Sequence, residues 1–250
     1  MMERDKEKYY YIPDSNPDDE NSPDTNSSGN KIDRALFEVE VDQNPYEPKV
    51  QFQDLIKIWD NVLEPEFCDH CIRKFEKDPY KYQGEVSSGA WGDTKRSVDL
   101  TITDKDHWAS EDKVFADCLT PKIDDYINSV TSFGQSFGDI FKLNAVAKKF
   151  YDCGYQIQRT KPGDFYIWHN DFSLYQGKYP RYLTFIWYLN DVIEDGYTEF
   201  SDGTRVQPKQ GTLLMFPATW TYGHRGYPPK YEIKYICTGW VHSTDNPNQE

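Results

Sequence analysis

The second half of the chain is a succession of short β-rich runs, and this succession strongly limits the folds that it can adopt. Turn residues separate the runs, among them Gly163-Asp164, Asp195-Gly196 and Pro228-Pro229. Many short strands in succession indicate a sandwich or a barrel rather than a parallel α/β sheet. We therefore expect a β-barrel or jelly roll at the C-terminal end. The runs cover residues 155–160, 165–169, 182–190, 198–200, 211–216 and 233–242.

The first half begins with a segment that has little to bury. Residues 1–34 consist mostly of Asp, Glu, Asn, Ser, Pro and Lys. Such a segment cannot remove enough apolar surface from water to offset the entropy that ordering costs. We expect an acidic, disordered N-terminal tail.

From residue 35 the pattern becomes typical of a folded chain. Alternation predicts strands at 35–41 and 97–102, and Pro65 suits the first turn of a helix. A second helix is predicted over 110–130, where the internal Pro121 should kink or split it. Its inward face is expected to hold Val114, Phe115, Cys118, Leu119, Ile123, Tyr126 and Ile127.

These elements together predict one domain over residues 35–245. A support region of helices and strands at 35–145 would pack on a β core at 146–243. The expected fold class is mainly β with flanking helices (α+β).

Composition restricts the partners and the compartment. The net charge of -14 argues against a nucleic-acid partner, because a phosphate backbone would be repelled over most of the surface. There is no apolar signal region and no long apolar run, so neither secretion nor a membrane span is expected. Five scattered cysteines fit a reducing, cytoplasmic setting. No feature sets an oligomeric state.

Two histidines of the β-rich half have neighbours that indicate a metal site. His169 and Asp171 are two residues apart, so in an extended segment both side chains point to the same side. His224 follows 53 residues after Asp171. Two histidines and one carboxylate are the ligand set of non-haem Fe(II) oxygenases. The His-x-Asp pair alone equally fits a turn with a solvated Asp, so the rest of the pattern decides.

A lysine in an otherwise apolar run supports the metal site. Lys234 stands ten residues after His224, in the run 233–241 that is apolar enough for a core strand. Alternation along this strand predicts one shared face for Lys234, Ile236, Thr238 and Trp240. A buried ammonium is costly unless an anion meets it. A dicarboxylate with one end on the metal would supply that anion. The alternative is an edge strand with Lys234 in solvent.

The stretch 155–242 resembles the Fe(II)/2-oxoglutarate-dependent dioxygenase superfamily, and most of all its prolyl 4-hydroxylase-like branch. The matching segments follow one another in family order over roughly 90 of the 250 residues. They are Tyr166 to Asp171, Arg181 to Asp191, Gly196 to Phe200, Gly211 to Pro217, His224 and Lys234. One departure is Asp195-Gly196-Tyr197-Thr198, where the family has Gly-Gly-x-Thr.

The resemblance implies a double-stranded β-helix (jelly roll) that hydroxylates an unactivated C–H bond and releases succinate and CO2. Fe(II), 2-oxoglutarate and O2 are the implied cofactor and co-substrates, with ascorbate as a candidate accessory reductant. His169, Asp171 and His224 would be the metal ligands and catalytic centre, and Lys234 would bind the distal carboxylate of 2-oxoglutarate. Tyr166, Thr198 and Thr238 are the other expected residues of the co-substrate pocket.

The expected substrate is a prolyl residue of a peptide or protein, and this follows from the branch alone. For the substrate mouth we expect Trp91 and Arg96, in the loop 84–96, and Trp240, which fits core packing equally well. Three alternatives stay open. The same chemistry could act on a free amino acid or small metabolite, the jelly roll could be a non-catalytic metal-binding module, or the acidic tail could recruit partners.

One further motif has the spacing of half a zinc site. Cys68-Asp69-His70-Cys71 has no second pair of suitable ligands downstream. On a helix Cys71 would fall on the apolar face, so packing is the expected role.

Overall fold

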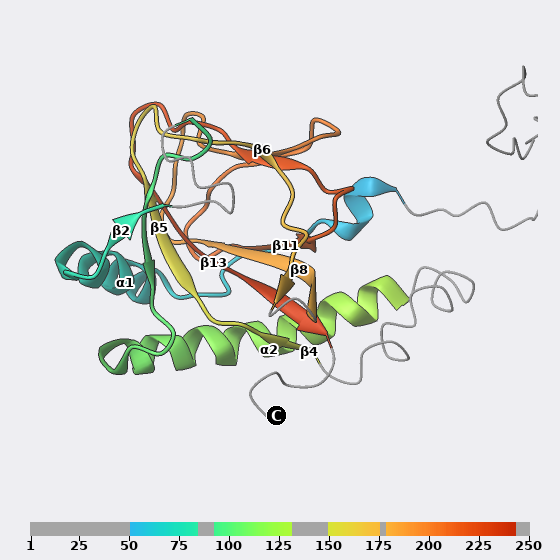
Figure 1. The fold of residues 1–250 in the computed structure, drawn as a ribbon, viewed down its shortest axis with the longest axis horizontal. Coiled ribbons are helices and arrows are strands. Elements are labelled where there is room, and N and C mark those ends of the chain that lie inside the picture. Colours follow the sequence, from blue (N-terminus) through green and yellow to red (C-terminus); the bar gives the residue numbers. More distant parts are fainter. Residues whose placement is uncertain (1–50, 85–92, 132–149, 176–178, 244–250) are drawn as a thin grey trace, which may run out of the picture. The chain divides into compact units, whose positions relative to one another are not determined.

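Two antiparallel β-sheets form the body of the computed structural model, which describes residues 51–84, 93–131, 150–175 and 179–243 (Figure 1). All of these residues lie in the unit Lys49–Glu250. The expected tail at 1–34, the expected strand at 35–41 and Trp91 fall outside the described residues. The predicted division between residues 145 and 146 stays a prediction, because 132–149 also fall outside them.

Within these ranges the larger sheet has nine strands and the smaller sheet four. The larger sheet contains, in order, β1 (Lys57–Trp59), β11 (Leu213–Pro217), β8 (Tyr179–Tyr188), β13 (Lys234–Ser243), β5 (Gln156–Thr160), β3 (Val98–Thr101) and β2 (Tyr82–Gln83), with β4 (Phe150–Asp152) beside β13 and β7 (Leu174–Tyr175) beside β8. The smaller sheet contains β10 (Arg205–Val206), β9 (Thr198–Phe200), β12 (His224–Gly226) and β6 (Tyr166–His169). Short 3-10 helices lie at Phe52–Leu55 and Asp106–Trp108.

The alternation of β13 separates two environments. Tyr235, Cys237 and Val241 point to the helical side of the larger sheet and are buried there. Lys234 and Thr238 point the other way, toward the smaller sheet, as the two-residue period of a strand requires. The long pairing with β8 fixes this register, with Trp240 opposite Thr184. The predicted sharing of one face by Lys234, Ile236, Thr238 and Trp240 is therefore observed.

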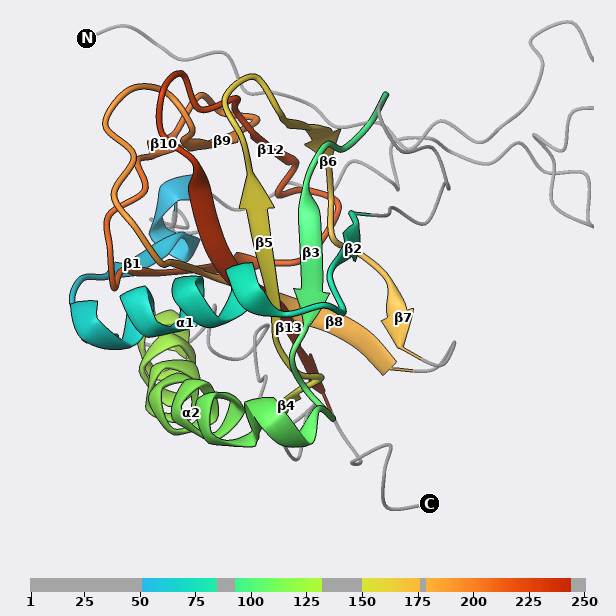
Figure 2. The ribbon, with the colours of Figure 1, turned by 90° about the vertical axis from the view of Figure 1, so that its left-hand side faces the viewer.

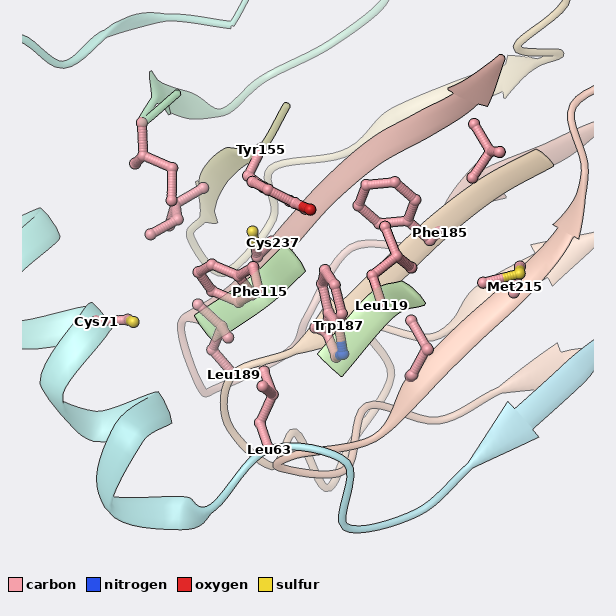
Figure 3. Close-up of a cluster of buried hydrophobic side chains, with 14 of the residues drawn as sticks. Leu63, Cys71, Phe115, Leu119, Tyr155, Phe185, Trp187, Leu189, Met215 and Cys237 are labelled. Carbon is pink, nitrogen blue, oxygen red and sulfur yellow. The ribbon is translucent and has the colours of Figure 1, made fainter. Parts of the chain in front are cut away.

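Helices α1 (Pro65–Lys77) and α2 (Ala109–Thr131) cover the outer face of the larger sheet, and the smaller sheet lies on the opposite side (Figures 1 and 2). Between helices and sheet lies the larger apolar core (Figure 3). Its centre is Trp187, whose ring lies 5.1 Å from that of Phe115 and 5.2 Å from that of Phe185. Aromatic rings bury much area each, so a chain with 16% aromatics can build this core.

A smaller apolar cluster holds the two sheets together. Phe200 of the smaller sheet meets Phe216 of the larger one edge-to-face, with ring centroids 4.8 Å apart. Ile186, Tyr188 and Leu214 belong to the same buried cluster. This packing sets the position of one sheet relative to the other, and the pocket described below lies between them.

The structure corrects two details of the expected second helix. α2 runs as one element through Pro121, so the split does not occur. Pro121 is exposed, and the buried neighbours Leu119 and Ile123 hold the helix on both sides of it. Val114, expected to face inward, is 36% exposed, because the apolar stripe of α2 is centred on Phe115 and Val114 lies at its rim.

A buried carboxylate joins the two helices. Glu111 of α2 accepts hydrogen bonds from Lys74 Nζ of α1 at 2.8 Å and lies 2.6 Å from His70 Nε2. Burial opposes the ionisation of Glu111, but the hydrogen bonds from Lys74, His70 and Ser110 outweigh it and lower its pKa to about 2. The ionised carboxylate therefore stabilises the folded state.

We expect Glu111→Gln to lower the free energy of unfolding at neutral pH by about 2 kcal/mol, since buried charge-assisted hydrogen bonds are lost. A depressed folded-state pKa stabilises the fold above the ordinary value of 4.5, and the stabilisation is lost as the pH falls toward about 2. Urea unfolding of both proteins between pH 2.5 and 7 checks this. Equal pH dependence in the two proteins would contradict the expected role of Glu111.

Candidate active site

A cluster of two histidines and one aspartate lies at the edge where β6 and β12 pair. His169 ends β6 and His224 begins β12, and the two are direct partners in the antiparallel register. Asp171 follows β6 by two residues. One ligand atom from each residue lies within 4.8 Å of the others, and no second group of this kind occurs among the described residues. The Nε2 atoms of His169 and His224 lie 3.8 and 3.5 Å from the Asp171 carboxylate oxygens.

Hydrogen bonds orient all three side chains for metal binding. Nδ1 of His169 lies 2.8 Å from the Ile167 carbonyl oxygen, and Nδ1 of His224 lies 3.1 Å from that of Tyr222. An imidazole that donates from Nδ1 keeps the lone pair of Nε2 for a metal. Thr184 Oγ1 donates to Asp171 Oδ2 at 2.8 Å, so the carboxylate is fixed as well.

The charge states of the cluster also suit a cation. Burial, and then the neighbouring His224, lower the pKa of His169 to about 4, so its imidazole is neutral at physiological pH. Burial opposes the ionisation of Asp171, but the adjacent His224 and His169 outweigh it and hold its pKa below the ordinary value. Neutral imidazoles and an ionised carboxylate are the forms that bind metals.

Lys234 is a buried ammonium on the opposite wall. It is 5% exposed, and its Nζ donates to the Gly196 carbonyl at 2.8 Å. Among the described residues no carboxylate forms an ion pair with it. Burial lowers the pKa of Lys234 to about 8. A buried ammonium without a counter-ion favours an anionic ligand.

The turn that contains the Gly196 carbonyl accommodates Asp195 in place of the glycine of the family pattern. Asp195 stands where the family has its first glycine, and it adopts a left-handed conformation with φ 62°. Gly196 is also left-handed, at φ 67°. Aspartate is one of the residues that adopts this region with little cost. The substitution therefore leaves the Gly196 carbonyl in reach of Lys234.

One pocket between the sheets brings nearly all of the predicted site residues together. Trp91 lies outside the described residues. The predicted residues that line the pocket are His169, Asp171, His224, Lys234, Tyr166, Thr198, Thr238, Arg96 and Trp240.

The two threonines of the pocket differ in what they offer a ligand. Thr238 donates its hydroxyl proton to the Phe185 carbonyl at 2.7 Å, so toward the pocket it is an acceptor only. Thr198 shares a 2.8 Å hydrogen bond with the hydroxyl of buried Tyr188. Their roles in co-substrate binding stay predictions.

Three polar residues around the pocket were not singled out from the sequence. Thr184 supports Asp171, as described above. Arg181 has its guanidinium carbon 3.5 Å from the ring centroid of Trp240. Lys95 lines the pocket and forms a buried ion pair with Asp99 at 2.7 Å. The argument that identified Lys234, a cation beside apolar strand residues, could also have identified Arg181. Lys95 belongs to no motif, so the sequence did not point to it.

A second, larger cavity adjoins the pocket. Its volume is about 450 Å³, and it shares Arg96 and Ser97 with the pocket wall. Apart from Val98, its remaining lining is polar or charged: Gln83, Asp93, Arg159, Lys161 and Asp164. The charges of both signs in this lining favour a polar ligand, which could extend into the cavity from the pocket that holds the histidines.

Comparison with known proteins agrees with this geometry. Residues 155–242 match the family model described as "2OG-Fe(II) oxygenase superfamily". This superfamily uses Fe(II), 2-oxoglutarate and O2, and the His-Asp-His cluster fits that cofactor set. A search of curated proteins found no matching sequence.

Three of the similar solved structures are prolyl hydroxylases. The viral collagen prolyl hydroxylase of Paramecium Bursaria Chlorella virus-1, in complex with 2-oxoglutarate, is 22% identical with a TM-score of 0.53, over 76% of this chain and 96% of that one. A Pseudomonas putida prolyl-4-hydroxylase is 15% identical with a TM-score of 0.53, over 75% and 92%. A Trichoplax adhaerens prolyl hydroxylase, in complex with a hypoxia inducible factor peptide, is 16% identical with a TM-score of 0.57, over 76% and 84%.

At these identities the similarity establishes the fold, which is a jelly roll with a double-stranded β-helix core, as the sequence predicted. No helix among the described residues is both long and apolar enough to cross a membrane. The expected resemblance is confirmed as well. Residues 155–242 match the 2OG-Fe(II) oxygenase superfamily model, and the fold built around them is similar to that of prolyl hydroxylases.

Proposed function

We propose that this protein is an Fe(II)- and 2-oxoglutarate-dependent dioxygenase that hydroxylates a prolyl residue of a peptide or protein. The observation that carries the proposal is Lys234, a buried ammonium without a carboxylate partner in the described part of the chain, in the same pocket as His169, Asp171 and His224. A mere metal-binding module has no use for this ammonium. A co-substrate that chelates the metal and carries a second carboxylate explains both features.

The residues present fit these groups. Nε2 of His169, Nε2 of His224 and the Asp171 carboxylate would hold Fe(II), which leaves positions for a bidentate co-substrate and O2. When bound, the iron supplies the oxidation of an unactivated C–H bond, coupled to the release of succinate and CO2. Lys234 would hold the distal carboxylate of 2-oxoglutarate, and Tyr166 would contact the same co-substrate.

The chain's own contribution is orientation and exclusion of water. Ile186, Ile236 and Trp240 line the pocket beside the metal ligands, and apolar walls limit the access of water to a reactive centre. Arg181, stacked on the pocket residue Trp240, donates to the Asp171 carbonyl at 3.4 Å and so helps to hold the segment that carries Asp171.

Two observations support a peptide rather than a small metabolite. The neighbouring 450 Å³ cavity extends the site beyond the volume that one amino acid needs. Three of the similar solved structures are prolyl hydroxylases, and one of them is described with a bound peptide. Arg96, shared by the pocket and the cavity, is the described residue best placed to contact the flanking peptide.

The first test is turnover of 2-oxoglutarate to succinate with Fe(II), ascorbate and a panel of proline-containing peptides. We expect iron-dependent succinate and a peptide mass increase of one oxygen in the wild type. His169→Ala should abolish both because it removes a metal ligand, whereas the control His107→Ala removes a histidine outside the pocket and should retain them. Absence of both iron-dependent succinate and 2-oxoglutarate binding would refute the proposal. If only free amino acids were hydroxylated, the proposed peptide substrate would be wrong and a free amino acid would be the substrate.

A second prediction follows from the lowered pKa of Lys234. The ammonium must be protonated to bind a carboxylate, and its pKa of about 8 in the free protein means that the proton is lost as the pH rises above that value. We expect the dissociation constant of 2-oxoglutarate to rise about tenfold per pH unit above pH 8. Lys234→Arg should remove this dependence, because guanidinium remains protonated. Calorimetry between pH 6.5 and 9.5 checks both, and a pH-independent wild type would contradict the role of Lys234.

A further inference from the structure

A short segment connects the two sheets beside the metal ligands. Arg96 N donates to the Phe165 carbonyl at 2.7 Å, and Ile167 N donates to the Thr94 carbonyl at 2.9 Å. Lys95 thereby pairs with Tyr166 as one further antiparallel bridge at the edge of β6. The chain then enters β3 of the larger sheet at Val98. The side chain of Lys95 consequently lies on the pocket wall.

The charge of Lys95 is matched by a carboxylate on the next strand. Lys95 Nζ donates to Asp99 Oδ2 at 2.7 Å, and Ser97 Oγ donates to Asp99 Oδ1 at 2.7 Å. The side chains of Lys95 and Asp99 are 6% and 1% exposed. Replacing such a buried pair by apolar residues is often neutral for stability. Stability alone is therefore a weak reason for a buried pair at this position.

An unbroken series of contacts leads from this pair to a metal ligand. Lys95 Nζ lies 5.3 Å from the ring centroid of Tyr166, within the range of a cation–π attraction. The Tyr166 ring stacks on the imidazole of His169, with centroids 3.5 Å apart and an angle of 15° between the planes. The ring of His169 is thus held by Tyr166, and Tyr166 by Lys95.

The two metal-ligand histidines differ in how their rings are supported. His224 is buried, and its ring packs on Phe216 at 4.8 Å and Phe200 at 6.0 Å. His169 ends a strand whose residues Ile167 and Trp168 are exposed, and among the described residues its ring contacts are with Tyr166 and, at 4.2 Å, with His224. Its Nδ1 hydrogen bond anchors one ring atom, and the stack with Tyr166 sets the ring plane.

We infer that Lys95, held in place by Asp99, is a positioning residue that fixes the Tyr166–His169 stack and thereby aims Nε2 of His169 at the metal. This role rests on the proposed function, in which His169 binds Fe(II). Lys95 acts on His169 through the ring of Tyr166.

The test removes the ion pair without leaving a buried charge. Lys95→Met/Asp99→Leu replaces both partners by apolar residues, so the protein should fold. Lys113→Met/Asp117→Leu is the matched control, because it removes the same charges at the same spacing from an exposed pair on α2. Lys95→Arg keeps the charge and should behave as the wild type.

The first measurement needs no metal. Ring-proton resonances of His169 carry the ring current of Tyr166, so NMR of the metal-free protein should show a shift for His169 in Lys95→Met/Asp99→Leu. The shift should be smaller for His224, whose ring centroid lies 4.2 Å from that of His169, and absent for His107, which lies outside the pocket. The second measurement is Fe(II) affinity, which should fall about tenfold, as is usual when support for a ligand is lost. The control pair should change neither quantity.

A double-mutant cycle separates positioning from a general structural effect. The loss of Fe(II) affinity should persist in a Tyr166→Phe background, which keeps the ring, and disappear in a Tyr166→Leu background, which removes it. An unmoved His169 resonance, or an equal loss of affinity in the Tyr166→Leu background, would overturn the inference. If the wild type binds no Fe(II), the proposed function fails, and the NMR comparison still decides whether Lys95 positions His169.

Discussion

The site depends first on the long antiparallel pairing of β13 with β8. Because side chains of a strand alternate, this pairing assigns Tyr235, Cys237 and Val241 to the helix-covered core and sends Lys234 and Thr238 into the pocket. A shift of one residue would exchange the two faces completely. The apolar face fixes the register, since burying Lys234 among α1 and α2 would be far more costly than burying Cys237 there. Core packing thereby determines that the ammonium group of Lys234 lies in the pocket.

Two buried ammonium groups share this pocket, and they differ in how their charge is compensated. Lys95 has its partner within the protein, in Asp99. Lys234 has only the Gly196 carbonyl among the described residues, and burial alone lowers its pKa. The first arrangement is complete without a ligand and is suited to holding neighbouring groups in place. The second remains electrostatically unsatisfied until an anion enters. Under the proposed function, the same residue type supports structure at one wall and recognises the co-substrate at the other.

The sequence predicted much of this, because strand alternation and the two-residue spacing of His169 and Asp171 are local patterns, and the resemblance to the dioxygenase superfamily added His224. Strands at 155–160 and 233–242, the common face of Lys234 and Trp240, and the jelly roll itself could be read from them. The role of Lys95 could not be predicted from the sequence, because it depends on a β-bridge to Tyr166, which lies 71 residues away along the chain. Only the folded chain brings the two residues together. Val114 was misplaced for a related reason: helical periodicity gives a stripe, and tertiary packing decides where its rim falls.

The two histidines of the metal-ligand set and Lys234 lie on different sheets, so the site exists only while the two sheets stay packed. His169 and His224 belong to the smaller sheet, whose short strands have little core of their own, and Lys234 belongs to the larger one. The contact of Phe200 with Phe216 joins the sheets directly beside His224. Elements with few buried contacts open at lower free energy than the main core. Binding of metal and dicarboxylate across this junction must then stabilise it, because ligands that bind only the closed arrangement favour that arrangement by mass action. The smaller sheet is therefore the part of the fold whose order should depend most on its ligands.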